Sequence, residues 1–176
     1  MEKLLVVDGN SIINRAFYGV RLLTNEEGVY TNAIYGFLNI LLKYVHGENP
    51  DYVAVAFDLA APTFRHKQYA DYKAGRKRMP DELAMQLPLL KEILSAMNVA
   101  QLSREGFEAD DIIGTLSAQS EQKGVECLVV TGDRDALQLA SDTTKIYLTS
   151  TRGGETQLQI MDRAAVQEKY GVSPRE

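Results

Sequence analysis

The chain consists of short apolar runs that alternate with amphipathic stretches. The runs KLLVVD at residues 3–8 and DYVAVAFD at residues 51–58 are nearly continuous and rich in branched residues, which is typical of buried parallel strands. VECLVVTGD at residues 125–133 has the same character, and VAQLS at residues 99–103 is a weaker candidate. The pattern therefore predicts four strands spread along the first three quarters of the chain.

Apolar residues at helical spacing lie between these strands. A helix is predicted after the turn GNS, and another over residues 31–47 with Gly47 as its stop. Residues 80–98 read as a helix that Pro88 should kink or divide, because proline cannot continue the hydrogen-bond ladder. Residues 106–124, GFEADDIIGTLSAQSEQKG, predict a further helix with an acidic start.

The last part of the chain has a different pattern. TTKIYLTSTRGGETQLQI predicts two short strands joined around Arg152-Gly153-Gly154, and Asp162 should cap a final helix that ends near Gly171. Alternation of strand and helix predicts an α/β fold, a mostly parallel central sheet with helices on both faces. Because no linker or repeat interrupts it, residues 1–176 are expected to form a single domain.

Composition supports a compact protein without a membrane segment. A chain of 176 residues with 45% hydrophobic content suits one domain with a real core. No run approaches the about 20 apolar residues of a membrane span, and the polar N-terminus does not fit a signal peptide, so we expect a cytoplasmic location and no membrane partner. Cys127 lies in an apolar run and should be a buried, inert thiol. One cysteine and two isolated histidines do not suit a zinc site.

Charge is distributed unevenly. Residues 62–80 hold six Lys/Arg against one Asp, a local charge of +5, so the rest of the chain carries −10. The simpler interpretation is a solvated surface with a mobile loop. The functional alternative is a grip for a polyanion, in which Lys and Arg pair with phosphates and Tyr69 and Tyr72 stack on bases.

Carboxylates occur where the predicted strands end and where the acidic helix starts. Each has a local explanation, because Asp and Glu cap helices and complement the helix dipole. Parallel strands, however, bring their carboxyl ends to one edge of the sheet, where like charges must take up protons or bind cations. Oxygen ligands favour Mg²⁺ or Mn²⁺, and a pair of such ions is a common device for hydrolysing phosphodiesters. The predicted ligands are Asp8, Asp58, Glu108, Asp110, Asp111, Asp133 and Asp135.

Four motifs together resemble a known family. LLVVDGNS, FDLAAPTFRHKQYADYKAGR, GFEADDIIGTL and VVTGDRDALQL are similar, in order and separation, to the amino-terminal 5′-nuclease domains of bacterial DNA polymerase I, within the flap endonuclease family and its PIN-like fold. The resemblance implies a structure-specific 5′–3′ exonuclease that removes 5′ flaps and RNA primers during replication and repair. Its partners would be DNA with a 5′ flap or single-stranded 5′ end, an RNA primer on DNA, and the rest of the polymerase chain.

The resemblance also assigns roles to residues. It places Asp8, Asp58, Glu108 and Asp110 around a first metal ion, with Asp111, Asp133 and Asp135 mainly around a second. Lys73 and Arg76 match positions that contact the reacting phosphate, so they are the expected catalytic cations. The expected nucleic-acid contacts are Arg65, Tyr72, Lys73, Arg76, Lys77 and Arg78. A helical arch inserted after the second strand, over about residues 73–98, would let a single-stranded 5′ end pass.

One departure and two alternatives accompany this interpretation. The family continues beyond the YGVSP region into two more metal-ligating aspartates and a helix-hairpin-helix element, so the resemblance predicts a fragment with weak or no flap cleavage, whereas the complete domain would hold two ions. A non-catalytic nucleic-acid-binding module would need only the basic segment. A phosphohydrolase of the haloacid-dehalogenase kind would use a strand-terminal aspartate as nucleophile, with a second aspartate at the place of Asn10.

Overall fold

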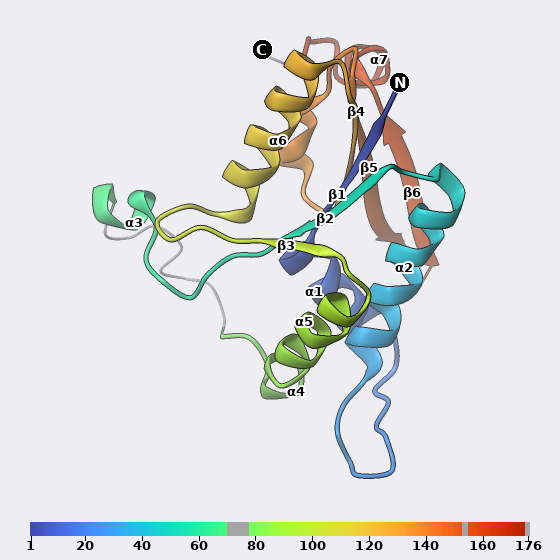
Figure 1. The fold of residues 1–176 in the computed structure, drawn as a ribbon, viewed down its shortest axis with the longest axis vertical. Coiled ribbons are helices and arrows are strands. Elements are labelled where there is room, and N and C mark those ends of the chain that lie inside the picture. The colour runs from blue at the N-terminus through green and yellow to red at the C-terminus, as the bar shows by residue number, and fades with distance from the viewer. Residues whose placement is uncertain (70–77, 153–154, 175–176) are drawn as a thin grey trace.

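A six-stranded sheet forms the centre of the computed structural model, which describes residues 1–69, 78–152 and 155–174 (Figure 1). The strand order is β3-β2-β1-β4-β5-β6, and only the β5–β6 pair is antiparallel among the described pairs. This arrangement confirms the expected α/β fold with a mostly parallel sheet. The strands are β1 Lys3–Asp8, β2 Tyr52–Ala56, β3 Ala100–Leu102, β4 Glu126–Thr131, β5 Thr144–Arg152 and β6 Glu155–Met161.

Helices cover both faces of the sheet, as the sequence predicts (Figure 1). Successive side chains of a strand point to opposite faces, so Leu5 and Val7 pack in one core cluster and Val6 in another. The first cluster lies under α1, α2 and α5, and the second under α6, η1 and α7. The helices are α1 Gly9–Gly19, α2 Asn32–Glu48, α3 Phe64–Gln68, α4 Asp81–Ala84, α5 Gln86–Ala96, α6 Ala109–Lys123, the 3₁₀ helix η1 Arg134–Leu139 and α7 Arg163–Tyr170.

The end of α2 departs from the predicted stop at Gly47. The helix continues through Glu48, and Asn49 takes the left-handed conformation with a φ of 47° while its N–H bonds the carbonyl of Val45. Asparagine tolerates this conformation better than most residues with a side chain. The prediction of Gly47 as the stop was therefore wrong by two residues.

The segment before β3 divides as Pro88 predicts. The break falls at Met85, between α4 and α5. Proline at position 88 has no N–H for the carbonyl of Ala84, and its ring crowds that carbonyl, so the hydrogen-bond ladder of the helix is interrupted there. An insertion after the second strand is thus confirmed.

Helix α5 packs into the core. Leu90 and Leu94 are fully buried in the cluster that contains α2. The side-chain oxygen of Gln86 accepts hydrogen bonds from the backbone N–H groups of Ala33 and Ile34, at 2.8 and 3.2 Å. The first part of the predicted arch, residues 73–77, lies outside the described residues.

The carboxyl-terminal elements match their predictions. Strands β5 and β6 pair antiparallel over residues 146–152 and 155–161, which confirms the hairpin. Asp162 caps α7 by accepting from the N–H of Ala165, and Gly171 ends the helix with a φ of 76°. Among the described residues, no helix combines the length and apolar character that crossing a membrane requires.

Cys127 is buried in β4, as expected. Burial raises the pKa of its thiol to about 11, so the reactive thiolate is scarce at neutral pH.

Candidate metal centre

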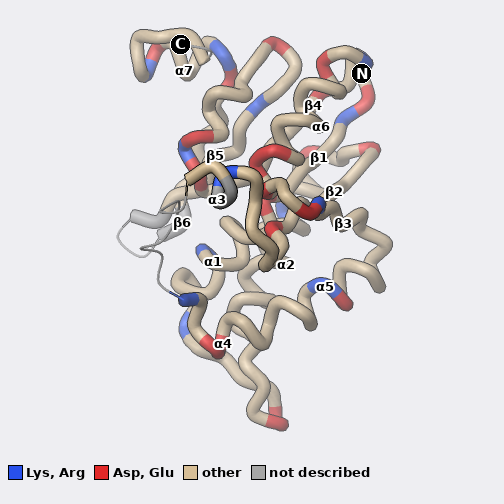
Figure 2. Tube along the Cα trace, turned by 90° about the vertical axis from the view of Figure 1, so that its left-hand side faces the viewer, with Lys and Arg blue, Asp and Glu red and all other residues tan. Residues whose placement is uncertain are grey.

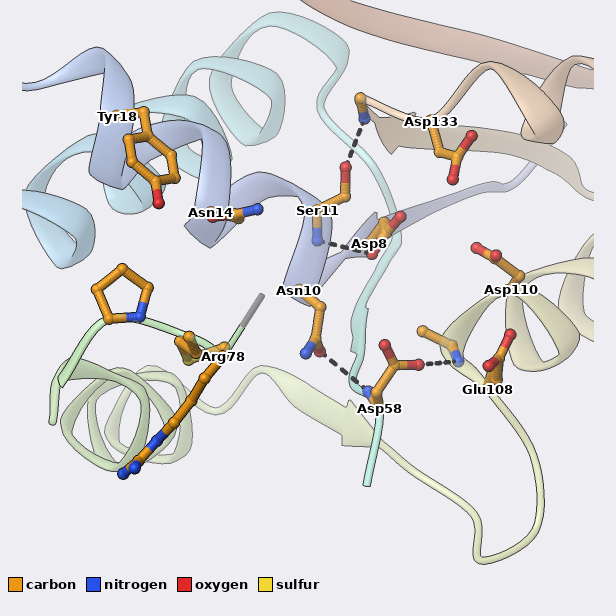
Figure 3. Close-up of a pocket in the computed structure, with 14 residues that line it drawn as sticks. Asp8, Asn10, Ser11, Asn14, Tyr18, Asp58, Arg78, Glu108, Asp110 and Asp133 are labelled. Carbon is orange, nitrogen blue, oxygen red and sulfur yellow. Dashed lines mark hydrogen bonds between the residues drawn. The ribbon is translucent and has the colours of Figure 1, made fainter. Parts of the chain in front are cut away.

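A pocket of about 680 Å³ opens where the carboxyl ends of β1, β2 and β4 meet the start of α6 (Figure 3). Ligand sites of open α/β sheets are found at this edge, because the loops after parallel strands part there. The carboxylates that line the pocket are Asp8, Asp58, Glu108, Asp110 and Asp133.

Asp8 both caps a helix and faces the pocket. It is the last residue of β1, and its Oδ1 accepts from the N–H of Ser11 at 3.1 Å. Its Oδ2 accepts from the buried hydroxyl of Thr131 at 2.8 Å. Burial raises the pKa of Asp8, with smaller contributions from the negative charges of Asp58 and Asp133, although the two hydrogen bonds act in the opposite direction.

Asp58 is held between two elements. Its Oδ1 accepts from the N–H of Ala109 at the start of α6, at 2.7 Å, and its own N–H donates to Oδ1 of Asn10 at 3.0 Å. Asn10 therefore fixes the backbone after β2, at the place where a haloacid dehalogenase would carry its second aspartate. Gly9 permits this approach, since a Cβ there would lie 2.8 Å from the carbonyl oxygen of Ala56.

The start of α6 brings two more carboxylates to the pocket. Glu108 is the N-cap, and its N–H donates to Oδ2 of Asp111 at 2.9 Å within a capping box. Glu108 is 7% exposed, whereas Asp110 in the first turn is accessible to solvent. Partial desolvation, followed by the charges of four neighbouring carboxylates, raises the pKa of Asp110 to about 6.

Thr131 links the carboxylate of Asp8 to the backbone of Asp133. Its hydroxyl, which donates to Asp8, also accepts from the N–H of Asp133 at 3.0 Å. Asp133 in turn caps η1 by accepting from the N–H of Asp135 at 2.9 Å. Sequence reasoning missed Thr131, Asn10 and Ser11 as parts of the site, and their only signal was a polar residue two or three positions from a carboxylate at a strand end.

Not every expected site residue reaches the pocket. Asp135 is exposed and does not line it. Asp111 points its carboxylate to Arg65, with both Arg65 Nη1–Asp111 Oδ2 and Arg65 Nη2–Asp111 Oδ1 at 2.8 Å. Arg78 lines the opposite side, but its guanidinium extends away from the carboxylates and lies 3.3 Å from Oδ1 of Asp81 (Figure 3). Four expected nucleic-acid contacts lie outside the described residues, namely Tyr72, Lys73, Arg76 and Lys77.

The chemistry of the pocket fits a hard divalent cation. Its acidic groups offer only oxygen donors, which Mg²⁺ and Mn²⁺ prefer. The raised pKa of Asp110 reflects desolvation first and then repulsion from the neighbouring carboxylates, and a cation would relieve that repulsion. Within the described residues, however, no three His, Cys, Asp or Glu side chains form a group that could hold an ion as they stand. The carboxylates surround the pocket and do not form a preassembled set of ligands.

Comparisons with known proteins identify close sequence relatives. A family model for the 5′-3′ exonuclease N-terminal, resolvase-like domain matches residues 3–171. DNA polymerase I of Bacillus subtilis is 45% identical over 175 residues, which cover 99% of this chain and 20% of that protein. DNA polymerase I of Caldicellulosiruptor bescii is 46% identical over 170 residues, covering 97% of this chain and 20% of the relative. The chain thus spans about a fifth of the length of these relatives.

Solved structures share the fold at low sequence identity. A bacteriophage T5 flap endonuclease, in a pseudo-enzyme-product complex with DNA and metal ions, superposes with a TM-score of 0.73 at 17% identity, covering 99% of this chain and 63% of that one. The T5 5′-exonuclease with bound divalent zinc has a TM-score of 0.71 at 18% identity, covering 97% and 62%. These neighbours confirm the 5′-nuclease fold.

Proposed function

The chain belongs to the family of 5′-3′ exonuclease N-terminal domains, and from that premise we propose that it catalyses metal-dependent hydrolysis of DNA phosphodiesters from a 5′ end. The proposed substrates are DNA with a 5′ flap or single-stranded 5′ end and RNA primers on DNA, and the chain would act as part of a DNA polymerase I. Support for DNA as the ligand comes from the neighbour solved with DNA and metal ions.

One observation carries this proposal: five carboxylates from separate parts of the chain line one pocket at the carboxyl edge of the sheet. A module that only bound nucleic acid would gain nothing from such a group, because negative charge repels phosphates. A pocket of this kind becomes attractive to a phosphodiester once cations occupy it. The proposed ligands are Asp8, Asp58, Glu108, Asp110 and Asp133, with Mg²⁺ or Mn²⁺ as the ions.

Bound divalent cations would supply an activated water and would stabilise charge on the phosphate and on the leaving oxygen. The described residues prepare the donors for this task. Ser11 and Thr131 orient the two oxygens of Asp8, and the N–H of Ala109 orients Asp58. These donors are backbone and hydroxyl groups, so they fix the carboxylates without neutralising their charge.

The other side of the pocket is suited to the substrate. Asn14 and Tyr18 line it opposite the carboxylates, and Arg78 lies beside them (Figure 3). An amide, an exposed aromatic ring and a guanidinium can contact phosphates and bases of a single strand. We further propose Lys73 and Arg76 as the cations that offset charge on the reacting phosphate.

The decisive experiment is Asp8→Asn in the full-length protein, assayed for Mg²⁺-dependent cleavage of a 5′-flap substrate. Asparagine retains one oxygen, which can keep the hydrogen bond from Ser11, but it lacks the second oxygen and the negative charge, so we expect at least about a 100-fold loss of rate with the fold intact. Asp51→Asn is the matched control, since Asp51 lies at the opposite edge of the sheet and accepts from the N–H of Lys3. Full flap cleavage by Asp8→Asn would refute the assignment.

A further inference from the structure

Two buried side-chain amides, Asn32 and Gln86, bond to each other between α2 and α5. Both residues are 0% exposed, and Nε2 of Gln86 donates to Oδ1 of Asn32 at 3.0 Å. Apolar side chains of similar size would fill this space without the cost of burying polar groups. A buried polar network whose members are all bonded holds one arrangement of the elements that it joins. The partners of the two amides therefore indicate what the pair positions.

Asn32 holds the end of α1. Its Nδ2 donates to the carbonyls of Phe17 and Val20, at 3.0 and 3.2 Å. Carbonyls at the end of a helix have no partner within the helix, and here the amide supplies one. The same helix carries Asn14 and Tyr18, which line the pocket opposite the carboxylates and are called the α1 wall below. Asn32 thus fixes the end of the helix that forms this wall.

Gln86 joins the start of α2 to α4. Its Oε1 accepts from the N–H groups of Ala33 and Ile34, and its Nε2 also donates to the carbonyl of Glu82 at 2.8 Å. The bond to Glu82 crosses the break at Met85 between α4 and α5. The oxygen accepts two hydrogen bonds and the nitrogen donates two, so the amide is fully used. Gln86 accordingly holds α4 in place relative to α2.

The residues directly before α4 form the other wall. Arg78, Met79 and Pro80 line the pocket and are called the α4 wall below. The carbonyl of Pro80 accepts from the N–H groups of Leu83 and Ala84, at 3.0 and 2.9 Å. Leu83 is buried in the core cluster that also holds α1 and α2. Figure 2 shows these helices gathered at one end of the molecule together with α5. The place of this wall therefore depends on where α4 is held.

We propose that Asn32 and Gln86 are positioning residues that fix the α1 wall and the α4 wall relative to each other. A continuous path of hydrogen bonds runs from the end of α1 through the two amides to α4. Tyr18 and Arg78 lie on the two sides of this part of the pocket, away from the carboxylates (Figure 3). This inference rests on the proposed function, because it takes a single-stranded 5′ end as the ligand between the walls.

The pair should act on the substrate and not on the metal ions. In the described part of the chain, the partners of the two amides are each other and backbone groups of α1, α2 and α4. The pocket carboxylates are instead held by Ser11, Thr131 and the N–H of Ala109. Loss of an amide should therefore loosen the walls and leave the carboxylates in place.

The first test is amide hydrogen exchange of the 176-residue chain, followed by NMR. Gln86→Met keeps an unbranched side chain of similar size but removes the amide. The N–H groups of Val20, Leu83 and Ala84, which bond carbonyls at the two walls, should exchange about tenfold faster or more, while those of β1 and β4 change by less than about threefold. Equal acceleration throughout the chain, or none at the walls, would overturn the proposal.

The second test separates KM from kcat for cleavage of a 5′-flap substrate by the full-length protein. Gln86→Met should raise KM by about fivefold or more and leave kcat within about twofold, because substrate binding weakens while the carboxylates stay in place. Thr144→Val is the matched control, since it also removes a buried side-chain hydrogen bond, to Ser117, and its KM should not change. An unchanged KM in folded Gln86→Met, or a loss confined to kcat, would overturn the proposal.

Asn32→Ala examines the other amide. It should also raise KM, and the double variant with Gln86→Met should lose less than the product of the two single effects, because both changes break the same path of hydrogen bonds. Mn²⁺ affinity, measured by calorimetry, should stay within about twofold in all three variants. Independent effects on KM, or a loss of Mn²⁺ affinity as large as the change in KM, would contradict the joint positioning role.

The two hypotheses can fail separately. If Asp8→Asn cleaves flaps normally, the proposed metal function fails, while hydrogen exchange still decides whether the amides hold the walls. Circular dichroism confirms that each variant is folded. Gln86→Asn replaces Gln86→Met if the latter unfolds. It keeps the amide but is one methylene shorter, so it cannot reach both α2 and α4, and KM should rise by about threefold.

Discussion

Acidic groups have different partners at the two edges of the central sheet. At the amino edge, where parallel strands begin, Glu126 and Glu48 have cationic or hydroxyl partners. Nζ of Lys145 lies 2.6 Å from Oε1 of Glu126, and Glu48 accepts from the hydroxyl of Tyr147 at 2.8 Å. Nζ of Lys3 lies 3.6 Å from Oε2 of Glu48. Charge at this edge is largely neutralised within the chain.

At the carboxyl edge the carboxylates are oriented but not neutralised. Asp8, Asp58 and Asp133 bond to backbone N–H groups or to the Thr131 hydroxyl. In the described part of the chain, no Lys or Arg lies within ion-pair distance of these three or of Asp110. Glu108 differs, because Arg65 lies 3.5 Å away.

The contrast separates stability from function. Acidic groups that are paired within the chain need no cation for their stability. Uncompensated carboxylates destabilise the ligand-free fold, so binding a cation to them is more favourable. The same residue types on the same sheet therefore serve two purposes, and hydrogen-bond donors without charge mark the functional edge.

The largest effect that tests this contrast is expected for Thr131→Val. Valine keeps the shape of the side chain but removes the hydroxyl that bonds both Asp8 and the N–H of Asp133. We expect Mn²⁺ to bind about tenfold more weakly by calorimetry, because the carboxylate of Asp8 and the backbone of Asp133 both lose a hydrogen bond that positions them. Thr131→Ser should restore most of the affinity. Unchanged Mn²⁺ binding in folded Thr131→Val would mean that the hydroxyl serves only the fold.

Thr144→Val is the matched control at the amino edge. The Thr144 hydroxyl is also buried, and it bonds the hydroxyl of Ser117 at 2.8 Å. Its loss should lower the free energy of unfolding by about 1 kcal/mol, measured with urea, and leave Mn²⁺ binding unaltered. Equal losses of Mn²⁺ affinity in the two valine variants would contradict the proposed functional difference between the two edges of the sheet.

The next effect concerns pH. The pKa of Asp110 is raised to about 6 in the folded chain, above the unfolded value of about 3.9. The folded state therefore holds the proton more tightly, and stability falls as pH rises from about 4 to about 6, with the unfavourable contribution complete above that range.

Asp110→Asn removes this contribution. Without metal ions, the original chain should lose about 1 kcal/mol more than Asp110→Asn between pH 4 and pH 7, a modest value because the side chain is accessible to water. Denaturant unfolding at several pH values measures the difference. At pH 7 with saturating Mn²⁺, the original chain should be more stable than Asp110→Asn, since only the original chain has the full set of carboxylates. Parallel pH profiles would contradict the prediction.

Much of the carboxyl edge of the sheet could be predicted from the sequence. Asp8 and Asp58 directly follow nearly continuous apolar runs, and Asp133 follows such a run after Thr131 and Gly132. Parallel strands carry such residues to one edge of the sheet. Pro88 also predicts the interruption between α4 and α5. These features depend on local pattern and on strand direction, and both are encoded over short stretches.

Other features depend on how distant segments dock. Arg65 and Asp111 are 46 positions apart, and each had a reasonable local interpretation without the other. Asp135 lies only two residues beyond Asp133, but the tight turn of η1 leaves it exposed and outside the pocket lining. Nothing in its motif distinguishes this short 3₁₀ turn from the start of an α-helix.

The smallest effect is expected at the amino edge, from Lys145→Gln. The hydrogen bond to Glu126 raises the pKa of Lys145, so the pair stabilises the fold at neutral pH and the contribution is lost as pH rises through the folded pKa. Lys145 is 41% exposed, so water screens the pair and the loss should be about 0.5 kcal/mol at low salt. Urea unfolding of Lys145→Gln, Glu126→Gln and the double variant isolates the coupling. Mn²⁺ affinity should be the same in all three, and a loss there would show that charge at this edge also serves the metal centre.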